Sequence, residues 1–382
     1  MASFCFIQII LLYSTKNSTF VSQLLRIEMA GNSYGNLFKL NTFGESHGKA
    51  IGGIIDGCPS NINVDYDLIS QQLSLRQNDP LHINKRKEAD EVEFLSGIFN
   101  GKTTGTPIAF LIHNKDSKPE DYAQQQTILK PSHGQFVYLQ KYGIFDYRGS
   151  GRVSARETAC RVVGGCFARM VLNQYKIKIE AFTTQIGQYK VGEPFFDNDF
   201  QTANENPLHC PDNEIASKML SLLKEIVKQK DSIGCKINCI IKNVPVGLGE
   251  PVFDKLSADL AKAMLSINAA KGFEYGSGFD SAQKKGSKMN DLFITNFQTK
   301  SNFSGGITAG ISNGNPIYFS VAFKPISSIM QDQSSIDLKG NSAILKASGR
   351  HDVCVSPRVL PVVEAMAAIT IADHLLRFNA YK

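Results

Sequence analysis

The order of strand-like and helix-like segments constrains the fold of this chain more than any other feature of its sequence. Short apolar or β-branched runs bounded by Gly, Pro or Asn predict strands, and apolar residues at helical spacing predict helices. Strands are expected at 37–43, 50–57, 92–99, 107–113, 177–186, 235–244, 305–312 and 316–323. Helices are expected at 65–76, from about residue 155, and at 214–230, 253–270 and 361–377. Because the two kinds of segment do not alternate regularly, we expect one α+β domain with antiparallel sheets rather than a doubly wound parallel sheet.

The first 28 residues differ in character from the rest of the chain. Residues 4–13 (FCFIQIILLY) form an apolar run that is too short to span a membrane. No Lys or Arg precedes this run, so it lacks the charged start of a secretory signal. We expect residues 1–28 to be an N-terminal extension, disordered or outside the functional protein, and residues 29–382 to form a single domain. A weak signal or transit peptide is the alternative.

The net charge indicates the kind of ligand that the protein binds, and the cysteines indicate its compartment. The net charge of +6 is spread along the chain instead of forming a dense basic stripe, so we expect a small anionic substrate and no nucleic acid. The eight cysteines include no CxxC pair, which argues against a zinc site and against a disulfide-rich secreted domain. We expect a cytoplasmic protein with reduced thiols, no metal and no membrane association.

Two histidines lie in glycine-containing turns. Residues 44–48 (GESHG) match the G-x-S-x-G pattern of serine hydrolases, but the following KAIGGIIDGCP does not predict the helix that this motif requires. A hydrolase using Ser46 is therefore the less favoured alternative. His47 in this turn and His133 in PSHG are candidates for proton transfer, since imidazole exchanges protons near neutral pH. Each histidine taken alone could equally be structural.

Two further segments carry groups suited to anions. Residues 146–157 (DYRGSGRVSARE) combine arginines with glycines and hydroxyls and run into a predicted helix, which favours an anion site over a solvated basic loop. They match neither a phosphate-binding P-loop nor a dinucleotide fingerprint. Towards the C-terminus, residues 324–328 (KPISS) and 349–352 (GRHD) supply cations, hydroxyls and a carboxylate.

Together these segments resemble the chorismate synthase family, and the resemblance extends from Met29 to the C-terminus. It is carried by GNSYGNLFKLNTFGESHG, YRGSGRVSARETACRV, SINAAKGFEYGSGF, FKPISSI and GRHDVCVSPRVLPVVEAMAAI. The resemblance implies a β-α-β sandwich with helices packed between antiparallel sheets, assembled as a homotetramer. It also implies a trans-1,4 elimination of phosphate from 5-enolpyruvylshikimate 3-phosphate, a phosphorylated dicarboxylate, to give chorismate. This last common step of aromatic amino acid biosynthesis uses reduced FMN without net redox change.

The resemblance also implies roles for individual residues. His47 would protonate or hydrogen-bond the reduced flavin, His133 would assist the departing phosphate, and Asp352 would help the flavin N5 region accept the substrate proton. The implied flavin-binding residues are Arg152, Val153, Ser154, Asn268, Ala269, Ala309, Lys324, Pro325, Ile326, Ser327, Ser328 and Arg350. The implied substrate- or nucleotide-binding residues are Arg76, Arg148 and Arg156. Without a dinucleotide fingerprint, we expect NADPH to act only as an indirect reductant through external reductases.

Several positions depart from the family pattern. The arginine-rich RRRPG loop of the family reads Leu75-Arg76-Gln77-Asn78-Asp79 here, and Phe145 stands where the family has arginine. Val153 replaces a serine, Ala309 replaces a glycine, and the family's HAD reads His133-Gly134-Gln135. Each lost charged hydrogen bond weakens anion binding by about 1.5–3 kcal/mol. A weakly active or non-catalytic flavin-binding descendant is therefore the second alternative.

Overall fold

The computed structural model describes residues 31–81, 90–115, 126–192, 202–347 and 351–382. The chain separates into two compact units, Met1–Tyr34 and Gly35–Lys382. In the first unit the described residues contain only the short strand β1 (Ser33–Tyr34). The predicted extension, residues 1–28, lies outside the described residues, and the predicted single domain stays a prediction. The second unit contains all the other described helices and strands.

The first sheet of this unit contains four antiparallel strands in the order β2-β3-β7-β4. They are β2 (Lys39–Gly44), β3 (Ala50–Asp56), β7 (Ile108–His113) and β4 (Val92–Phe94). Buried and exposed residues alternate along β2, as expected for a strand with one face against a core. The predicted strands at 37–43, 50–57 and 107–113 are confirmed, whereas 92–99 is divided between β4 and β5 (Ile98–Phe99).

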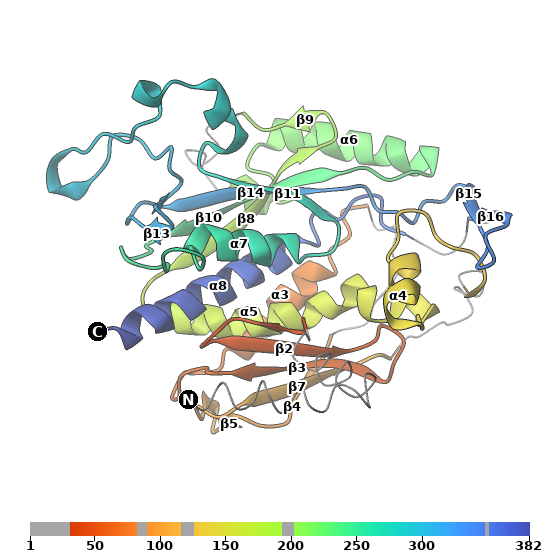
Figure 1. The fold of residues 1–382 in the computed structure, drawn as a ribbon, viewed down its shortest axis with the longest axis horizontal. Helices are drawn as coiled ribbons and strands as arrows, with labels where there is room; N and C mark the ends of the chain where they lie inside the picture. The colour runs from red at the N-terminus through yellow and green to blue at the C-terminus, as the bar shows by residue number, and fades with distance from the viewer. Residues whose placement is uncertain (1–30, 82–89, 116–125, 193–201, 348–350) are drawn as a thin grey trace, which may run out of the picture. The chain divides into compact units, whose positions relative to one another are not determined.

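The second sheet has the order β11-β14-β10-β8-β9, again antiparallel. Its strands are β11 (Ala270–Tyr275), β14 (Ile317–Phe323), β10 (Cys235–Lys242), β8 (Lys178–Ile186) and β9 (Tyr189–Lys190). The three central strands are buried along nearly their whole length. Such continuous burial indicates that both faces of the sheet are covered. In Figure 1, α6 (Asn213–Gln229) lies on one side of this sheet and α7 (Leu256–Leu265) on the other.

The helical layer lies between the two sheets (Figure 1). It contains α3 (Tyr66–Arg76), α5 (Thr158–Asn173), α7 and α8 (Leu360–Ala380). A Cβ added at Gly165 would lie 2.3 Å from that of Ala365, so a glycine is needed where α5 and α8 approach each other. Fifteen residues of α8 are buried, as expected for a helix enclosed on all sides. The predicted α+β fold, with helices packed between antiparallel sheets, is confirmed.

Some predicted elements differ from those observed. The helix predicted at 253–270 ends at Leu265, and β11 follows almost at once. Ala269 has φ +67° between them, a left-handed conformation that cannot continue a helix. The strand predicted at 305–312 is a hairpin of β12 (Ile307–Thr308) and β13 (Ile311–Ser312), which turns at Ala309 and Gly310, both with positive φ.

The remaining elements are short, and apart from the turn at Ala155–Glu157, where a helix was expected to begin, none of them was predicted from the sequence. They are β6 (Lys102–Thr103), α4 (Gln135–Tyr142), β15 (Gln333–Ile336), β16 (Ser342–Leu345) and the 3-10 turns η2 (Arg148–Val153), η3 (Ala155–Glu157), η5 (Thr202–Glu205), η6 (Gly278–Gln283), η7 (Gly286–Lys288) and η8 (Thr295–Phe297).

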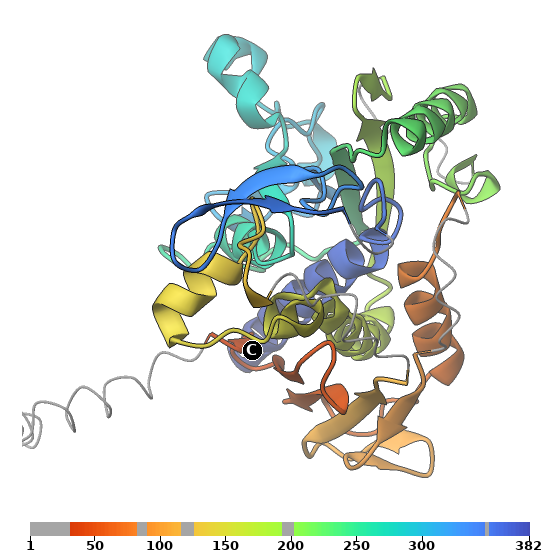
Figure 2. The same cartoon turned by 90° about the vertical axis from the view of Figure 1, so that its right-hand side faces the viewer.

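The loops singled out in the sequence lie towards one end of this unit. The β2–β3 turn, the segment before α5 and the end of β14 are at the right of Figure 1 and face the viewer in Figure 2, and the start of α8 lies nearer the centre of Figure 1. No helix in the described part of the chain combines the length and apolar character needed to cross a membrane.

Candidate active site

The turn that carries His47 packs against the arginine- and glycine-containing segment 148–154. The Ser46 amide donates to the Gly151 carbonyl (3.3 Å), and the Ser46 hydroxyl donates to the Gly149 carbonyl (2.7 Å). Gly149 has φ +56°, and a Cβ there would lie 2.4 Å from His47 Nε2. Only a glycine therefore allows the imidazole to lie this close to the backbone.

The same turn argues against the serine hydrolase alternative. The nucleophile elbow requires a strand, a sharp turn and then a helix. Here the turn joins β2 to β3, and the Ser46 hydroxyl is used to bind a backbone carbonyl. Ser46 thus serves to hold two loops together.

His133 also contacts segment 148–154. Its Nε2 is 2.9 Å from the Ser150 hydroxyl, and its Nδ1 accepts the Gln135 amide at 3.3 Å. Because Nδ1 accepts a hydrogen bond from an N–H, the neutral ring carries its proton on Nε2 and donates it to Ser150. The proton of His133 therefore points towards segment 148–154. Phe145, which replaces the family's arginine, packs edge-on against the His133 ring with centroids 6.1 Å apart.

Two lysines surround His133 and connect it to the loop after β14. Lys324 donates from Nζ to the Ser132 carbonyl (2.9 Å), and Lys130 donates from Nζ to the Ser328 hydroxyl. Burial, followed by the charges of Lys130 and Lys324, lowers the pKa of His133 to about 4. Burial also lowers the pKa of Lys130 to about 8. We call His133, Ser150, Lys130 and Lys324 the imidazole cluster; at neutral pH its histidine is uncharged and its cations face uncharged oxygens.

Most of the predicted flavin-binding residues lie around this cluster. Arg152 donates from Nη2 to the carbonyl (2.8 Å) and hydroxyl (2.6 Å) of Thr42, and that hydroxyl in turn donates to Glu157 (2.7 Å). Asn268 donates from Nδ2 to the Val153 carbonyl at 2.9 Å. The Ala269 carbonyl accepts the Lys324 amide at 3.0 Å. Segments 152–153, 268–269 and 324 are thereby joined directly.

The other predicted flavin-binding residues have more varied surroundings. Ser154 accepts the Arg156 amide through its hydroxyl (3.3 Å) and begins the turn before α5. The Ile326 carbonyl accepts the Ser232 hydroxyl at 2.7 Å. Pro325 is exposed and Ser327 is half-buried on the same loop. Ala309 lines a groove with Phe273, Phe279 and Phe303, away from the contacts described above. Arg350 lies outside the described residues.

The predicted substrate-binding arginines separate into two groups. Arg148 forms an ion pair with Asp146 (2.9 Å) at the surface. Arg76 and Arg156 instead share Asp90, whose side chain is fully buried. We call Arg76, Arg156 and Asp90 the arginine cluster. Burial alone would raise the pKa of Asp90, but the two guanidinium groups hold it below its usual value, so the carboxylate is ionised at neutral pH.

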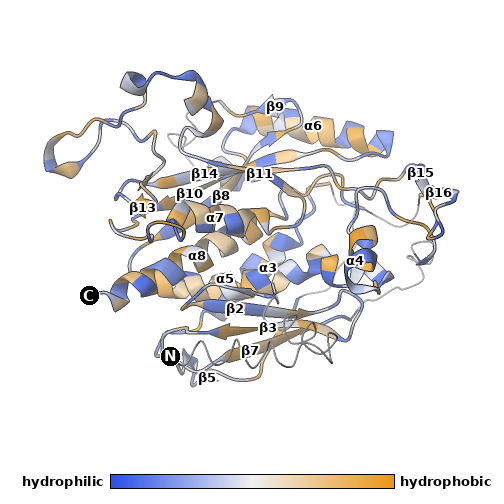
Figure 3. Cartoon of the chain, in the orientation of Figure 1, coloured by the Kyte–Doolittle hydropathy of each residue, from blue (hydrophilic) through white to orange (hydrophobic). Residues whose placement is uncertain are grey.

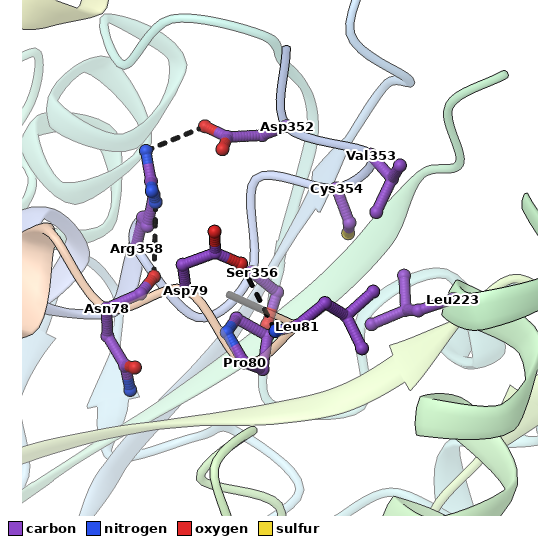
Figure 4. A pocket seen from close by; sticks show the side chains of 10 residues that line it. All are labelled: Asn78, Asp79, Pro80, Leu81, Leu223, Asp352, Val353, Cys354, Ser356 and Arg358. Carbon is purple, nitrogen blue, oxygen red and sulfur yellow. Dashed lines mark hydrogen bonds and ion pairs between the residues drawn. The ribbon is translucent and has the colours of Figure 1, made fainter. Parts of the chain in front are cut away.

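Asp352 is held at the start of the segment that leads into α8. Arg358 donates from Nη1 to Asp352 (2.9 Å) and from Nε to the Asn78 carbonyl (3.1 Å). Figure 4 shows Asp352 and Arg358 on the wall of a small cavity that is also lined by Asp79 and Leu81. Arg358 also acts electrostatically on Arg76, so Asp352 adjoins the arginine cluster.

Sequence reasoning missed Lys130, Asp90 and Arg358. Lys130 lies three residues before His133, and this proximity was its only available signal. The partners of Asp90 and Arg358 are set by the fold, because the pairs Arg156–Asp90 and Arg358–Asn78 are 66 and 280 residues apart in sequence.

Comparison with known proteins agrees with this architecture. The chorismate synthase family model matches residues 38–376. A chorismate synthase of Christiangramia forsetii is 51% identical over 355 residues, covering 93% of this chain and 100% of the relative. One of Flavobacterium psychrophilum is 53% identical over 354 residues, covering 92% and 99%. A crystal structure of a chorismate synthase has a TM-score of 0.70 at 30% identity and covers 90% of this chain and 93% of the other. The match thus extends over nearly the whole length of both partners in each comparison, and the chain belongs to the chorismate synthase family.

Proposed function

We propose that this protein forms chorismate by trans-1,4 elimination of phosphate from 5-enolpyruvylshikimate 3-phosphate. The observation that carries the proposal is the meeting of the segments around 133, 148–154 and 324–328 in the imidazole cluster. Nearby lie the arginine cluster and the turn of His47. This arrangement supports the proposal because it offers several cations to a substrate with one phosphate and two carboxylates, together with two imidazoles that would transfer protons.

His133 is suited to assist the departing phosphate. In the protein without substrate its ring is neutral, because burial first and then the charges of the two lysines lower its pKa. A phosphate bound to these lysines would offset their charge and favour protonation of His133. The Nε2 proton, which the ring donates to Ser150, is the one that a leaving phosphate oxygen would receive.

The surroundings of His47 also fit reduced FMN as the cofactor. Gly149 lets the His47 ring lie against the backbone. The hydroxyls and backbone amides of these loops, with the cations Arg152 and Lys324, suit a flavin with its phosphate. When bound, reduced FMN would supply electron density to the allylic system, with no net redox change. Arg152, Asn268, Lys324 and Ser328 would hold it, and His47 would hold a proton near it. NADPH would serve only as an indirect reductant.

We also propose that the protein assembles as a homotetramer. The segment between β11 and β12, residues 276–306, projects from the sheet (Figure 1) and mixes hydrophobic with hydrophilic residues (Figure 3). Phe279, Phe293 and Phe297 on it are 77%, 79% and 95% exposed. Aromatic side chains exposed to this degree favour burial against another subunit. Sedimentation of the purified protein tests this, and a monomer at micromolar concentration would contradict it. A cytoplasmic location stays a prediction from the sequence.

The deciding experiment is an anaerobic assay of chorismate formation with dithionite-reduced FMN. We expect turnover that requires both the substrate and the reduced flavin. A folded protein that binds FMN without forming chorismate would support the non-catalytic alternative. Labelling of Ser46 by a fluorophosphonate would instead favour a hydrolase.

A further inference from the structure

Asp90 connects two arginines that come from different elements. Arg76, the last residue of α3, donates from Nη2 to Asp90 Oδ2 at 2.8 Å, and Arg156 pairs through Nη1 with Oδ1. The Asp90 side chain is 0% exposed and those of the two arginines are each 14% exposed. Both carboxylate oxygens are thus in use, and neither guanidinium can move without breaking its bond to Asp90.

The far side of the Arg156 guanidinium is also fixed. Its Nε donates to Asn114 Oδ1 at 3.1 Å. Asn114 donates in turn to the carbonyls of Glu45 (3.0 Å) and Gly48 (2.9 Å), which flank His47. A continuous hydrogen-bonded path therefore runs from Asp90 through Arg156 to the turn of His47.

The charges in this cluster require a carboxylate at this place. Arg156 and Arg358 are both close enough to Arg76 for their positive charges to disfavour the charged form of Arg76. Burial lowers the pKa of Arg76, and Asp90 offsets that effect. Two partly buried cations that share no counter-charge would repel each other and separate. Arg76 Nε is buried with no hydrogen-bond partner among the described residues, so this guanidinium retains a donor.

We propose that Asp90 is a positioning residue, which holds Arg76 and Arg156 side by side so that together they bind an anionic group of the substrate. This inference rests on the proposed function. Asp90 acts through the arginines and takes no part in the proton transfers of His47 and His133. Its effect should therefore fall on substrate binding more than on turnover.

The kinetic test is Asp90→Asn, which keeps the shape of the side chain and removes its charge. We expect KM for the substrate to rise about 10- to 100-fold, as for the loss of a charged hydrogen bond, while kcat changes much less. Asp332→Asn is the matched control, because Asp332 pairs with Lys346 (2.8 Å) at the surface. An unchanged KM in Asp90→Asn, with only a lower melting temperature, would overturn the proposal.

Two further variants test the route of the effect. Asp90→Glu keeps the negative charge but places it on a side chain that is longer by a methylene group. We expect the KM of this variant to lie between those of wild type and Asp90→Asn. If Asp90→Asn does not fold, Asp90→Glu is used for the test. Arg76→Gln, alone and combined with either Asp90 variant, completes a double-mutant cycle. If Asp90 acts through Arg76, the two changes in KM are less than additive. Full additivity contradicts the proposal.

A readout without turnover separates this proposal from the proposed function. Inorganic phosphate represents the phosphate group of the substrate and malonate its carboxylates. We expect at least one of them to raise the melting temperature of wild type and of Asp332→Asn, but not of Asp90→Asn, because a ligand stabilises only a protein that binds it. The ion that acts identifies the group bound. Equal shifts in all three proteins, or none in wild type, would refute the role of Asp90 even if chorismate is formed. Absence of chorismate formation with the expected shifts would refute only the proposed function.

Discussion

The imidazole cluster and the arginine cluster differ in whether their positive charges are compensated by a carboxylate. In the arginine cluster, two guanidinium groups share the buried carboxylate of Asp90. In the imidazole cluster, Lys130 and Lys324 donate to uncharged oxygens, and the histidine between them is kept neutral. Two cations that share a counter-charge are held rigidly before a ligand binds, whereas two cations without a counter-charge are stabilised most by the binding of an anion. The difference suggests that the arginine cluster fixes the position of the substrate and the imidazole cluster responds to its charge.

The largest expected effect is the loss of an imidazole. His47→Ala and His133→Ala should each lower turnover by about 10²–10⁴-fold, the usual contribution of a general acid or base. His113→Ala is the control, because His113 lies at the end of β7 and pairs with Glu93 at the surface (2.9 Å). Steady-state kinetics with reduced FMN measures this. Full activity in His133→Ala would remove the functional difference between the two clusters.

A methyl group at Gly149 should have the next largest effect. Its Cβ would lie 2.2 Å from a carbon of the His47 ring, so the ring or the backbone must move. Displacement of a catalytic group by about 1 Å can cost about 10²-fold in rate, and we expect a loss of that order in kcat. Gly192→Ala, where a Cβ meets nothing within 4 Å, should be neutral. Equal activities of the two variants would show that His47 needs no such close fit.

Removing one lysine should change the titration of His133. Lys130→Met removes the charge of a residue that helps to hold the pKa of His133 down to about 4. We expect that pKa to rise towards the ordinary value of about 6.5, as followed by NMR of the histidine ring. Lys141→Met on α4 is the control, since Lys141 lies over the Tyr142 ring (5.1 Å). An unchanged titration would mean that burial alone keeps His133 neutral.

The smallest expected effect is on the pH dependence of stability. The pKa of His133 is lower in the folded protein, at about 4, than in the unfolded chain, where it is about 6.5. The unfolded chain therefore binds the proton more readily, and the contribution of His133 to stability is lost as pH falls from about 6.5 to about 4. In urea unfolding at pH 7 and pH 5, His133→Gln should lose less stability on acidification than wild type. His113→Gln should behave as wild type does.

The candidate site residues found from the sequence are those that are continuous in the chain. Gly149 to Ser154 were recognisable as a candidate anion-binding segment because glycine, serine and arginine alternate over a few residues. His47 and His133 were recognisable by their glycine-containing turns. The helices α5 and α8 followed from their apolar spacing, and only their contact at Gly165 depended on the fold.

The groups that tune the site could not be predicted. Asp90 precedes a strand of only three residues, and nothing near it in the sequence indicates two arginine partners. Lys130 lowers the pKa of His133 through its charge. Its contact with Ser328, 198 residues away, is set by the fold. The left-handed backbone at Ala269, between α7 and β11, was missed because alanine itself carries no signal for it. Such features depend on tertiary contacts between distant segments.

The titration of His133 tests the account most directly. In wild type, NMR of the ring should give a pKa of about 4 without anions, and saturating inorganic phosphate should raise it by offsetting the two lysines. A pKa near the ordinary value of about 6.5 that phosphate does not change would contradict the idea that Lys130 and Lys324 form a charge-responsive cluster around this histidine.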